Sequence, residues 1–477
     1  MTSDTTNLRQ FYEKKEPMIK ANDKNKSFRR VIPILSISAA LLFLGFVTPA
    51  HATEPDEMSF ILNSFSFLIW GVLVMWMCAG FTMLESGCVR TKNVSVICLK
   101  NIGLFSIASL AYYTVGYNVM YVDVEAGGFF GSFKLFYGSN EAELALIEGL
   151  TEDTAAVVEG GYSTMSDWFF QMVFVATTAS IISGTLAERV RLAPFFVFVA
   201  GLTAFIYPTV GAWHWGGGWL AEMGFQDFAG STIVHSTGGW AALAGAILLG
   251  ARGGRFQADG TVRSMPPSNV PIVTLGVFIL WMGWFGFNGG SQLALSSALD
   301  LVAISNILAN TNIAAAAGVI MSLIVSRPLL GRIDLMATLN GAIAGLVAIT
   351  AGPDIVNHQW AIFIGAIGGL ISVLGIKLLE VSKIDDVVGA IPAHLFAGVW
   401  GTLAVCIAAG GDIIVQAIGI AAIGVFVFGT SIILWFVIDK LIGLRVSPQA
   451  EALGQDVTEL GIEAYPEFVA VPEDIDI

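Results

Sequence analysis

The stretch DFAGSTIVHSTGGWAALAGAILLG, residues 227–250, decides the fold because it places a histidine, His235, in an apolar run long enough to cross a membrane. The hydrocarbon of a bilayer offers an ionisable side chain no water, so such a residue needs a partner or a function. His235 is therefore a buried hydrogen-bonding residue, a metal ligand, or part of a path for a small polar molecule.

The composition of the whole chain favours a membrane protein. Of 477 residues, 55% are hydrophobic and 13% charged, and the mean hydropathy is +0.75. A soluble domain of this size needs more charged residues to cover its surface. The apolar residues come in blocks of roughly 20, the length that a helix needs to cross the hydrocarbon core. We therefore predict an all-α polytopic membrane protein. The net charge of −14 gives no indication of a nucleic-acid partner.

The first segment, residues 1–52, resembles a bacterial secretory signal peptide. Basic residues precede the apolar run VIPILSISAALLFLGFV, and Ala50 and Ala52 occupy the small-residue positions of a cleavage site. Cleavage after Ala52 would leave a mature N-terminus on the outer face. The alternative is an uncleaved anchor helix.

The remaining apolar blocks predict eleven membrane spans. We expect them at residues 59–83, 95–120, 167–187, 192–212, 231–250, 270–289, 302–325, 335–352, 360–379, 390–409 and 415–439. Lys and Arg residues occupy every second loop and the C-terminal tail, apart from Lys134 in the 121–166 loop and Lys100, which we expect to snorkel. This alternation predicts a multi-pass protein of the inner (plasma) membrane, with its N-terminus outside and its C-terminus in the cytoplasm.

The chain also repeats a pattern. The fifth span reads HSTGGWAALAGAILLG from His235, and the tenth reads HLFAGVWGTLAVCIAAG from His394. Five spans separate the two, an odd number, so the copies must have opposite orientations in the membrane. We therefore predict two inverted five-helix repeats plus a final helix, with the two histidines together at the centre.

A pair of buried histidines suits a narrow channel. Two neutral imidazoles can hydrogen-bond to each other, and their remaining polar edges suit a small neutral molecule with a lone pair and N–H bonds. The same channel suits a bare cation badly, because the cation would lose its hydration at a large free-energy penalty. A metal site would need a third ligand, and neither an HExxH motif nor a carboxylate one turn away accompanies either histidine. We therefore expect no metal and no cofactor.

Aromatic residues form the second candidate group. Phe174, Trp215 and Phe287 are expected in the middles or toward the outer ends of spans that flank the histidines. Aromatic faces stabilise a dehydrating cation by roughly 0.5–2 kcal/mol each, enough to concentrate ammonium or a methylated amine. The alternative is an interfacial aromatic belt and helix packing.

These segments together resemble the ammonium transporter family (Amt/Mep/Rh). The resemblance covers about residues 60–465 and is carried by DFAGSTIVHSTGG, WHWGGGWLAEMG, GWFGFNGGS, SGTLAERVR and the DD-x7-H spacing from Asp385 and Asp386 to His394. It implies a homotrimer with eleven helices and one pore in each subunit. We expect no enzymatic activity, because the sequence shows no nucleophile–base constellation. The resemblance also implies roles: an external ammonium site of Trp215, Phe174 and Ser291 supported by Asp227, a phenyl gate of Phe174 and Phe287, and a pore lined by His235, His394 and Trp284.

The implied mechanism explains the histidine in the opening stretch. Ammonium, or methylammonium as an analogue, is recruited as a cation, loses its proton at the phenyl gate and crosses as ammonia past His235 and His394. The resemblance also implies an aspartate five residues before the second histidine and a glycine after it, but this sequence has Gly389 and Leu395. That departure concerns the polarity of the inner exit of the pore and the conduction rate. The alternative function is an ammonium sensor that conducts weakly and signals through its tail.

The division predicted for the rest of the chain is a transporter domain at 53–443 and a cytoplasmic regulatory tail at 444–477. The tail resembles the family's tail, which couples subunits and docks near a PII-type signalling protein; the alternative is a solvated acidic tail. Leu460 replaces the usual histidine. The matching tail positions are Glu451, Gly454, Asp456, Glu459, Gly461, Glu463, Ala464 and Tyr465.

Overall fold

The computed structural model describes residues 55–468. The predicted signal segment, residues 1–52, lies outside the described residues. The described part is helical, and it contains two isolated β-bridges but no strand. The prediction of an all-α protein is confirmed.

Ten helical segments in the described part are long and apolar enough to cross a membrane, and the shorter apolar α14 (Leu335–Ile349) corresponds to the eighth predicted span. The ten are built from α2 (Pro55–Cys88), α3 (Val94–Ala111) with η2 (Tyr112–Gly116) and α4 (Tyr117–Tyr121), α7 (Thr164–Thr185), α8 (Leu192–Gly201) with η3 (Leu202–Ile206), α9 (Tyr207–His214) and α10 (Trp219–Glu222), η4 (Ser231–Ser236) with α11 (Thr237–Leu249), α12 (Val270–Gly290), α13 (Ala298–Leu330), α15 (His358–Val381), η5 (Ile391–Phe396) with α16 (Ala397–Ala409), and α17 (Ile413–Ile442).

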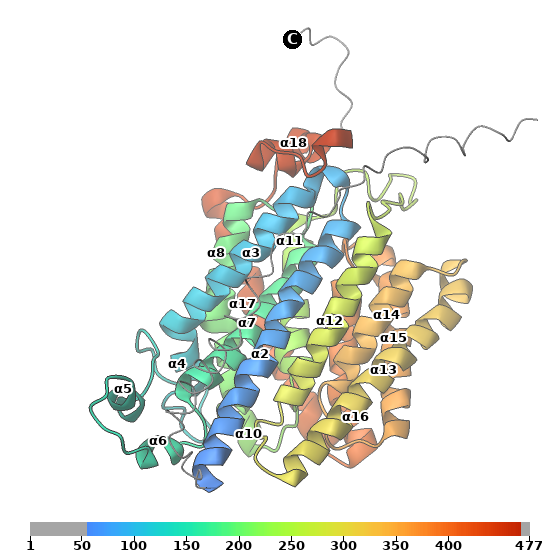
Figure 1. Cartoon of the computed structure of the whole chain (residues 1–477). Coiled ribbons are helices and arrows are strands. Elements are labelled where there is room, and N and C mark those ends of the chain that lie inside the picture. Colours follow the sequence, from blue (N-terminus) through green and yellow to red (C-terminus); the bar gives the residue numbers. More distant parts are fainter. Residues whose placement is uncertain (1–54, 469–477) are drawn as a thin grey trace, which may run out of the picture. The chain divides into compact units, whose positions relative to one another are not determined.

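Short helices lie in the connections and the tail. They are η1 (Thr91–Asn93), α5 (Glu141–Ile147), α6 (Ala155–Val158), α18 (Pro448–Leu453), η6 (Asp456–Leu460) and η7 (Pro466–Phe468). The long helices run side by side, with α18 at one end of the bundle and α5, α6 and α10 at the other (Figure 1). We call these the tail end and the loop end.

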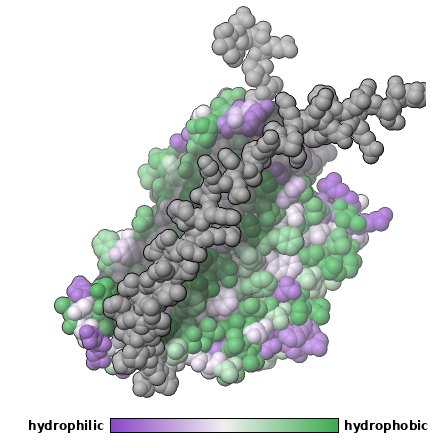
Figure 2. All heavy atoms as spheres, viewed as in Figure 1, coloured by the Kyte–Doolittle hydropathy of each residue, from purple (hydrophilic) through white to green (hydrophobic). Residues whose placement is uncertain are grey.

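The flank of the bundle is apolar. In Figure 2 hydrophobic residues cover the visible flank, whereas hydrophilic residues gather toward the two ends. Leu110, Phe278 and Val425 are examples, with exposed fractions of 66%, 64% and 77%. Large apolar side chains this exposed are expected where lipid, not water, surrounds the helices.

Glycines allow helices to pack with their backbones in close contact. α2 and α12 pack along each other, and a Cβ atom on Gly276 would lie 2.4 Å from the backbone nitrogen of Leu84. Without a hydrophobic driving force between helices in lipid, such close backbone contact is a main source of helix association. The glycines of GVFILWMGWFG in α12 therefore contribute to helix packing.

The predicted repeat is visible in the structure. Each histidine lies in a six-residue π-helical segment, η4 or η5, and each segment continues into a 13-residue helix, α11 or α16. η4 packs against α16 and η5 packs against α11, so each π-helical segment meets the helix of the other copy. This crossed contact brings the two copies together in the interior of the bundle.

Lys100 differs from the prediction. We expected its ammonium to snorkel to the membrane surface, but the side chain is 2% exposed. Its Nζ donates to the carbonyl of Ser183 at 2.7 Å and lies 3.7 Å from a carboxylate oxygen of Glu85. The prediction of snorkelling is wrong because α2 and α7 provide a negative partner and an acceptor inside the bundle, and a paired charge can stay buried.

Candidate functional site

The two histidines meet. Nδ1 of His394 lies 3.2 Å from Nδ1 of His235, and their ring centroids are 5.3 Å apart. Both side chains are buried, and Nε2 of His235 makes no hydrogen bond among the described residues. One Nδ1 must donate and the other accept, so the two neutral rings have opposite tautomers.

Two aspartates hold the histidine segments. The carboxylate of Asp227 accepts backbone N–H groups from four successive residues, Gly230 to Ile233, at 2.7–3.2 Å. The carboxylate of Asp386 accepts the N–H groups of Gly389 and Ile391 at 3.1 and 2.8 Å. These N–H groups have no partner inside the helix, so the aspartates satisfy them and fix where each segment begins.

The DD-x7-H spacing includes Asp386, but the sequence alone assigned it no structural role. We expected an aspartate five residues before His394, where the chain has Gly389. Gly389 has a φ of 79° and Gly230 a φ of 106°, so both copies need a glycine at that position. Asp386, eight residues before His394, is the counterpart of Asp227, eight residues before His235.

Aromatic rings lie against the first histidine. Phe174 stacks on Phe287 with ring centroids 4.0 Å apart, and Phe287 lies 5.2 Å from the His235 ring. Trp284 stacks on His235 at 4.8 Å, and its Nε1 donates to the Thr350 hydroxyl at 2.8 Å. The structure therefore places four of the five predicted gate and pore residues, Phe174, Phe287, Trp284 and His235, in one buried stack.

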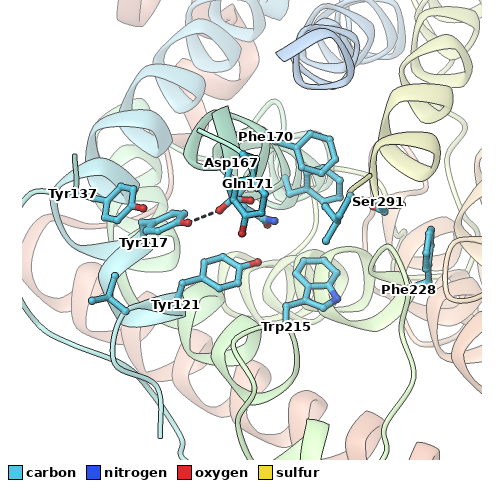
Figure 3. Close-up of a pocket in the computed structure, with 13 residues that line it drawn as sticks. Tyr117, Tyr121, Tyr137, Asp167, Phe170, Gln171, Trp215, Phe228 and Ser291 are labelled. Carbon is cyan, nitrogen blue, oxygen red and sulfur yellow. Dashed lines mark hydrogen bonds between the residues drawn. The ribbon is translucent and has the colours of Figure 1, made fainter. Parts of the chain in front are cut away.

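A cavity of about 440 Å³ opens above this stack at the loop end. We call it the tyrosine cavity. Its walls are formed by Tyr117, Tyr121, Val122, Tyr137, Tyr162, Asp167, Phe170, Gln171, Phe174, Trp215, Phe228, Ser291 and Leu293. Figure 3 shows Trp215 and Ser291 on one side and the tyrosines on the other, with Asp167 and Gln171 between them.

The three residues predicted for the external site line this cavity. Ser291 donates its hydroxyl to the Phe287 carbonyl at 2.8 Å, which leaves its oxygen lone pairs free to accept. Trp215 donates Nε1 to the Asp227 carbonyl at 3.1 Å. Asp227 thus contacts the site through its backbone, while its carboxylate caps η4.

The sequence reasoning missed the opposite wall. Tyr117 and Tyr121 on α4, Tyr137 in the following loop, and Asp167 on α7 come from segments that it treated as an acidic loop and span ends. Tyrosines recurring four residues apart in TVGYNVMY were the available signal. Without knowing that α4 and α7 meet, that signal does not separate a cavity wall from an interfacial belt.

A line of shared residues continues to the tail end. His394 borders a cavity of about 10 Å³, which also touches Asn340 and Val388. Asn340 and Val388 also line a third cavity of about 370 Å³ with Arg252, Arg255 and others, which we call the arginine cavity. The histidine pair therefore lies between two large cavities and is separated from each by packed side chains.

Charged residues surround the arginine cavity. Arg252 donates Nε and Nη2 to the two carboxylate oxygens of Asp385 at 2.8 and 2.9 Å, and its Nη1 donates to Glu188 at 3.3 Å. Burial alone would raise the pKa of the Asp385 carboxyl, but the hydrogen bonds and charge of Arg252 hold this pKa well below its usual range.

The tail packs against this charged end. Asp456 accepts the N–H groups of Ser95 and Val96 at 2.9 and 2.8 Å, at the first turn of α3. Glu451 accepts from the Gly253 N–H at 2.6 Å and from Arg445 at 2.8 Å. Two of the carboxylates matched in the sequence thus bind the rim of the bundle, so the tail is not merely solvated.

Comparison with known proteins assigns the family. Residues 65–465 match the Ammonium Transporter Family. The chain belongs to this family. Among its relatives are the ammonium transporter Amt2 of Archaeoglobus fulgidus, 40% identical over 86% of this chain and 89% of the relative, and a putative ammonium transporter of Synechocystis sp., 39% identical over 92% and 97%.

Solved structures of the ammonium transporter family have the same fold. The Sensor Amt Protein has a TM-score of 0.76 and 36% identity over 84% of this chain and 99% of its own. Mep2 of Candida albicans has a TM-score of 0.72 and 25% identity over 87% and 93%. The family is one of transporters and not of enzymes, and with its apolar helices the chain is a multi-pass membrane protein.

Proposed function

We propose that this protein moves ammonium nitrogen through a pore in each subunit, from the tyrosine cavity past His235 and His394 to the arginine cavity. The observation that carries the proposal is the 3.2 Å contact between the two histidines, directly beneath the stacked rings of Phe174 and Phe287. The family and its named relatives support ammonium as the cargo.

The tautomers of the pair explain selection for a neutral species. The ring that donates through Nδ1 presents a lone pair at Nε2, and the ring that accepts presents an Nε2–H group. Ammonia matches both because it has N–H bonds and one lone pair. Ammonium has no lone pair, and a positive charge in this buried stack would lose its hydration, at a penalty of several kcal/mol. Potassium cannot become neutral and is excluded.

We assign the recruitment steps to the residues above the pair. Ammonium binds against Trp215 and Phe174 and donates a hydrogen bond to Ser291. It passes its proton to solvent water in the tyrosine cavity where Phe174 and Phe287 close the path, and the nitrogen continues as ammonia. Asp227 acts as a positioning residue, because its carboxylate is used by η4 while its carbonyl holds the Trp215 indole at 3.1 Å. Trp284 fixes the plane of the His235 ring.

Flux measurements on reconstituted protein test this proposal. Phe174→Ala, His235→Ala and His394→Ala are made separately, and ammonium-evoked current on a solid-supported membrane is compared with methylammonium uptake. Each histidine removed deletes a hydrogen bond of about 1 kcal/mol to the crossing molecule, so we expect uptake to fall by about fivefold. His358→Gln, outside the pair, is the matched control and should leave uptake unchanged. Passage of rubidium as readily as methylammonium would refute the proposal.

A second function, ammonium sensing, is favoured by one observation. The Sensor Amt Protein resembles this chain with a TM-score of 0.76. In that case the same site would bind ammonium, and the tail contacts at Ser95 and Gly253 would change when ammonium is bound. Saturable ammonium binding without measurable flux in proteoliposomes would favour the sensor over the transporter.

We further propose the arrangement in the membrane and the assembly that the resemblance implied. The protein lies in the inner membrane of a bacterial cell. Its loop end faces outward and its tail end faces the cytoplasm, because Lys and Arg gather at the tail end. Three copies assemble into a homotrimer, and a PII-type protein docks at the tail end. Native mass spectrometry tests the trimer, and N-terminal sequencing tests removal of residues 1–52.

A further inference from the structure

Asp167 is the one carboxylate among the described residues that line the tyrosine cavity. It lies near the start of α7 and is 7% exposed. Its carboxylate accepts a hydrogen bond from the Tyr117 hydroxyl, as Figure 3 shows. No Lys or Arg nitrogen in the described part of the chain lies within 4.0 Å of it, and Lys134 in the neighbouring loop pairs with Asp123 instead.

Other acidic residues of this protein have structural tasks that Asp167 lacks. Asp227, Asp334 and Asp412 accept backbone N–H groups at the starts of helices. At the start of α7 a different residue does this, because Glu143 accepts the Thr164 N–H at 2.7 Å. The carboxylate of Asp167 is therefore held by two neutral groups, the Tyr117 hydroxyl and the Gln171 amide, and has no Lys or Arg beside it.

The walls around Asp167 are aromatic. Tyr117 lies 5.2 Å from Tyr121 and 3.9 Å from Tyr137, measured between ring centroids. Figure 3 shows Tyr121 extending toward Asp167 and Gln171, with Trp215 across the cavity. Aromatic faces combined with a carboxylate are the chemistry that recognises substituted ammonium cations. A volume of about 440 Å³ is far more than ammonium needs and falls in the range of small-molecule pockets.

We propose that the tyrosine cavity is a binding site for alkylammonium cations, including quaternary ones, with Asp167 as its charged anchor. A primary amine cation donates N–H groups to the carboxylate. A quaternary cation has none and is held by charge and by the faces of Tyr121 and Trp215. Given the proposed pore, it cannot lose a proton to pass the phenyl gate, so it blocks the entrance in competition with ammonium.

Tetramethylammonium is the probe for this site. Its binding to the purified full chain is measured by isothermal titration calorimetry, and its inhibition of methylammonium uptake is measured in proteoliposomes. We expect saturable binding and competitive inhibition by the parent protein. Absence of saturable binding, or inhibition that raising methylammonium does not relieve, would overturn the proposal.

Variants locate the anchor. Asp167→Asn keeps an oxygen to accept from Tyr117 but removes the charge, and should weaken tetramethylammonium binding by about tenfold or more. Asp123→Asn, which removes an exposed carboxylate of the same end, is the matched control and should bind as the parent does. Equal affinities for Asp167→Asn and the parent would refute the anchor role.

Two further variants separate this proposal from the pore and from misfolding. His235→Ala should lower uptake yet bind tetramethylammonium as the parent does, so failure of the pore proposal leaves the cavity proposal intact. If Asp167→Asn does not fold, Tyr121→Leu removes one aromatic face and should weaken binding about threefold to tenfold. Unchanged binding by Tyr121→Leu would contradict the aromatic cage.

Discussion

The two histidine segments share a spacing but differ in how their aspartates are used. Both read aspartate, two residues, glycine, four residues, histidine, from Asp227 to His235 and from Asp386 to His394. Asp227 accepts four backbone N–H groups, whereas Asp386 accepts two and the Thr185 hydroxyl. Pro392 stands where Ile233 stands in the first copy, and proline has no N–H to donate.

The difference shows which parts of the repeat the histidine pair requires. An aspartate, a glycine with positive φ and a π-helical turn occur in both copies, and together they set the position and direction of each ring. π-Helical segments are rare and concentrate at functional sites, consistent with this role. The remaining partners are adapted to each end: aromatic rings beside the first aspartate, and the Arg252 and Asp385 pair beside the second.

The largest expected effect comes from removing the two aspartates. Asp227→Ala leaves four buried N–H groups without their acceptor, so we expect a destabilisation of about 3–5 kcal/mol. Asp386→Ala leaves two and should cost about 2–3 kcal/mol. Thermal unfolding followed by fluorescence-detected size exclusion ranks the two variants in detergent. Equal losses would show that the number of N–H groups does not set the stability of the segments.

The two glycines should differ in the same direction. A Cβ on Gly230 would lie 2.5 Å from Cγ2 of Val234 and 3.1 Å from the Trp215 ring, whereas a Cβ on Gly389 would meet one side chain, the amide of Asn340, at 2.5 Å. In both variants alanine must adopt a positive φ, which strains its backbone. Gly389→Ala should therefore destabilise the protein by about 1–2 kcal/mol, and Gly230→Ala, which also contacts the Trp215 ring, by about 2–4 kcal/mol.

The matched readout for the glycines is ligand binding. Gly230→Ala displaces the Trp215 indole and should weaken methylammonium binding, while Gly389→Ala lies at the other end and should not. A Gly389→Ala variant with the larger binding defect would contradict the assignment of the tyrosine cavity as the entrance.

The charged surroundings of the second copy predict acid sensitivity. Because the pKa of Asp385 is depressed in the folded protein, its pair with Arg252 contributes stability above the usual carboxylate pKa of about 4. That stability is lost as the pH falls toward the folded pKa. The unfolding temperature of the parent should therefore begin to fall below about pH 5 and fall most steeply below about pH 4. Asp385→Asn should unfold at a lower temperature at pH 7 but show a shallower acid decline.

The sequence predicted the spans, the inverted repeat and the meeting of His235 with His394 because these depend on hydropathy, charge and spacing alone. It did not predict Asp167 or the tyrosine wall, since those residues become neighbours only when α4 packs beside α7. Lys100 was misplaced for the same reason: its partners Glu85 and Ser183 lie on other helices. The aspartate that positions the second histidine segment is Asp386, eight residues before His394, and the effect of Gly389 on the inner exit stays a prediction.

The smallest expected effect tests whether Thr185 substitutes for a missing N–H. Its hydroxyl donates to Asp386 at 3.0 Å, a contact without a counterpart at Asp227. Thr185→Val keeps the shape and removes one hydrogen bond to a carboxylate, so we expect a loss of about 1–2 kcal/mol. Thr232→Val, which removes a buried hydroxyl contact with Thr402 at 2.6 Å in the first copy, is the control. If the hydroxyl compensates for Pro392, Thr185→Val should add little to the loss caused by Asp386→Ala, because both remove the same contact. Additive losses would mean that Thr185 stabilises the second copy by a route independent of its aspartate.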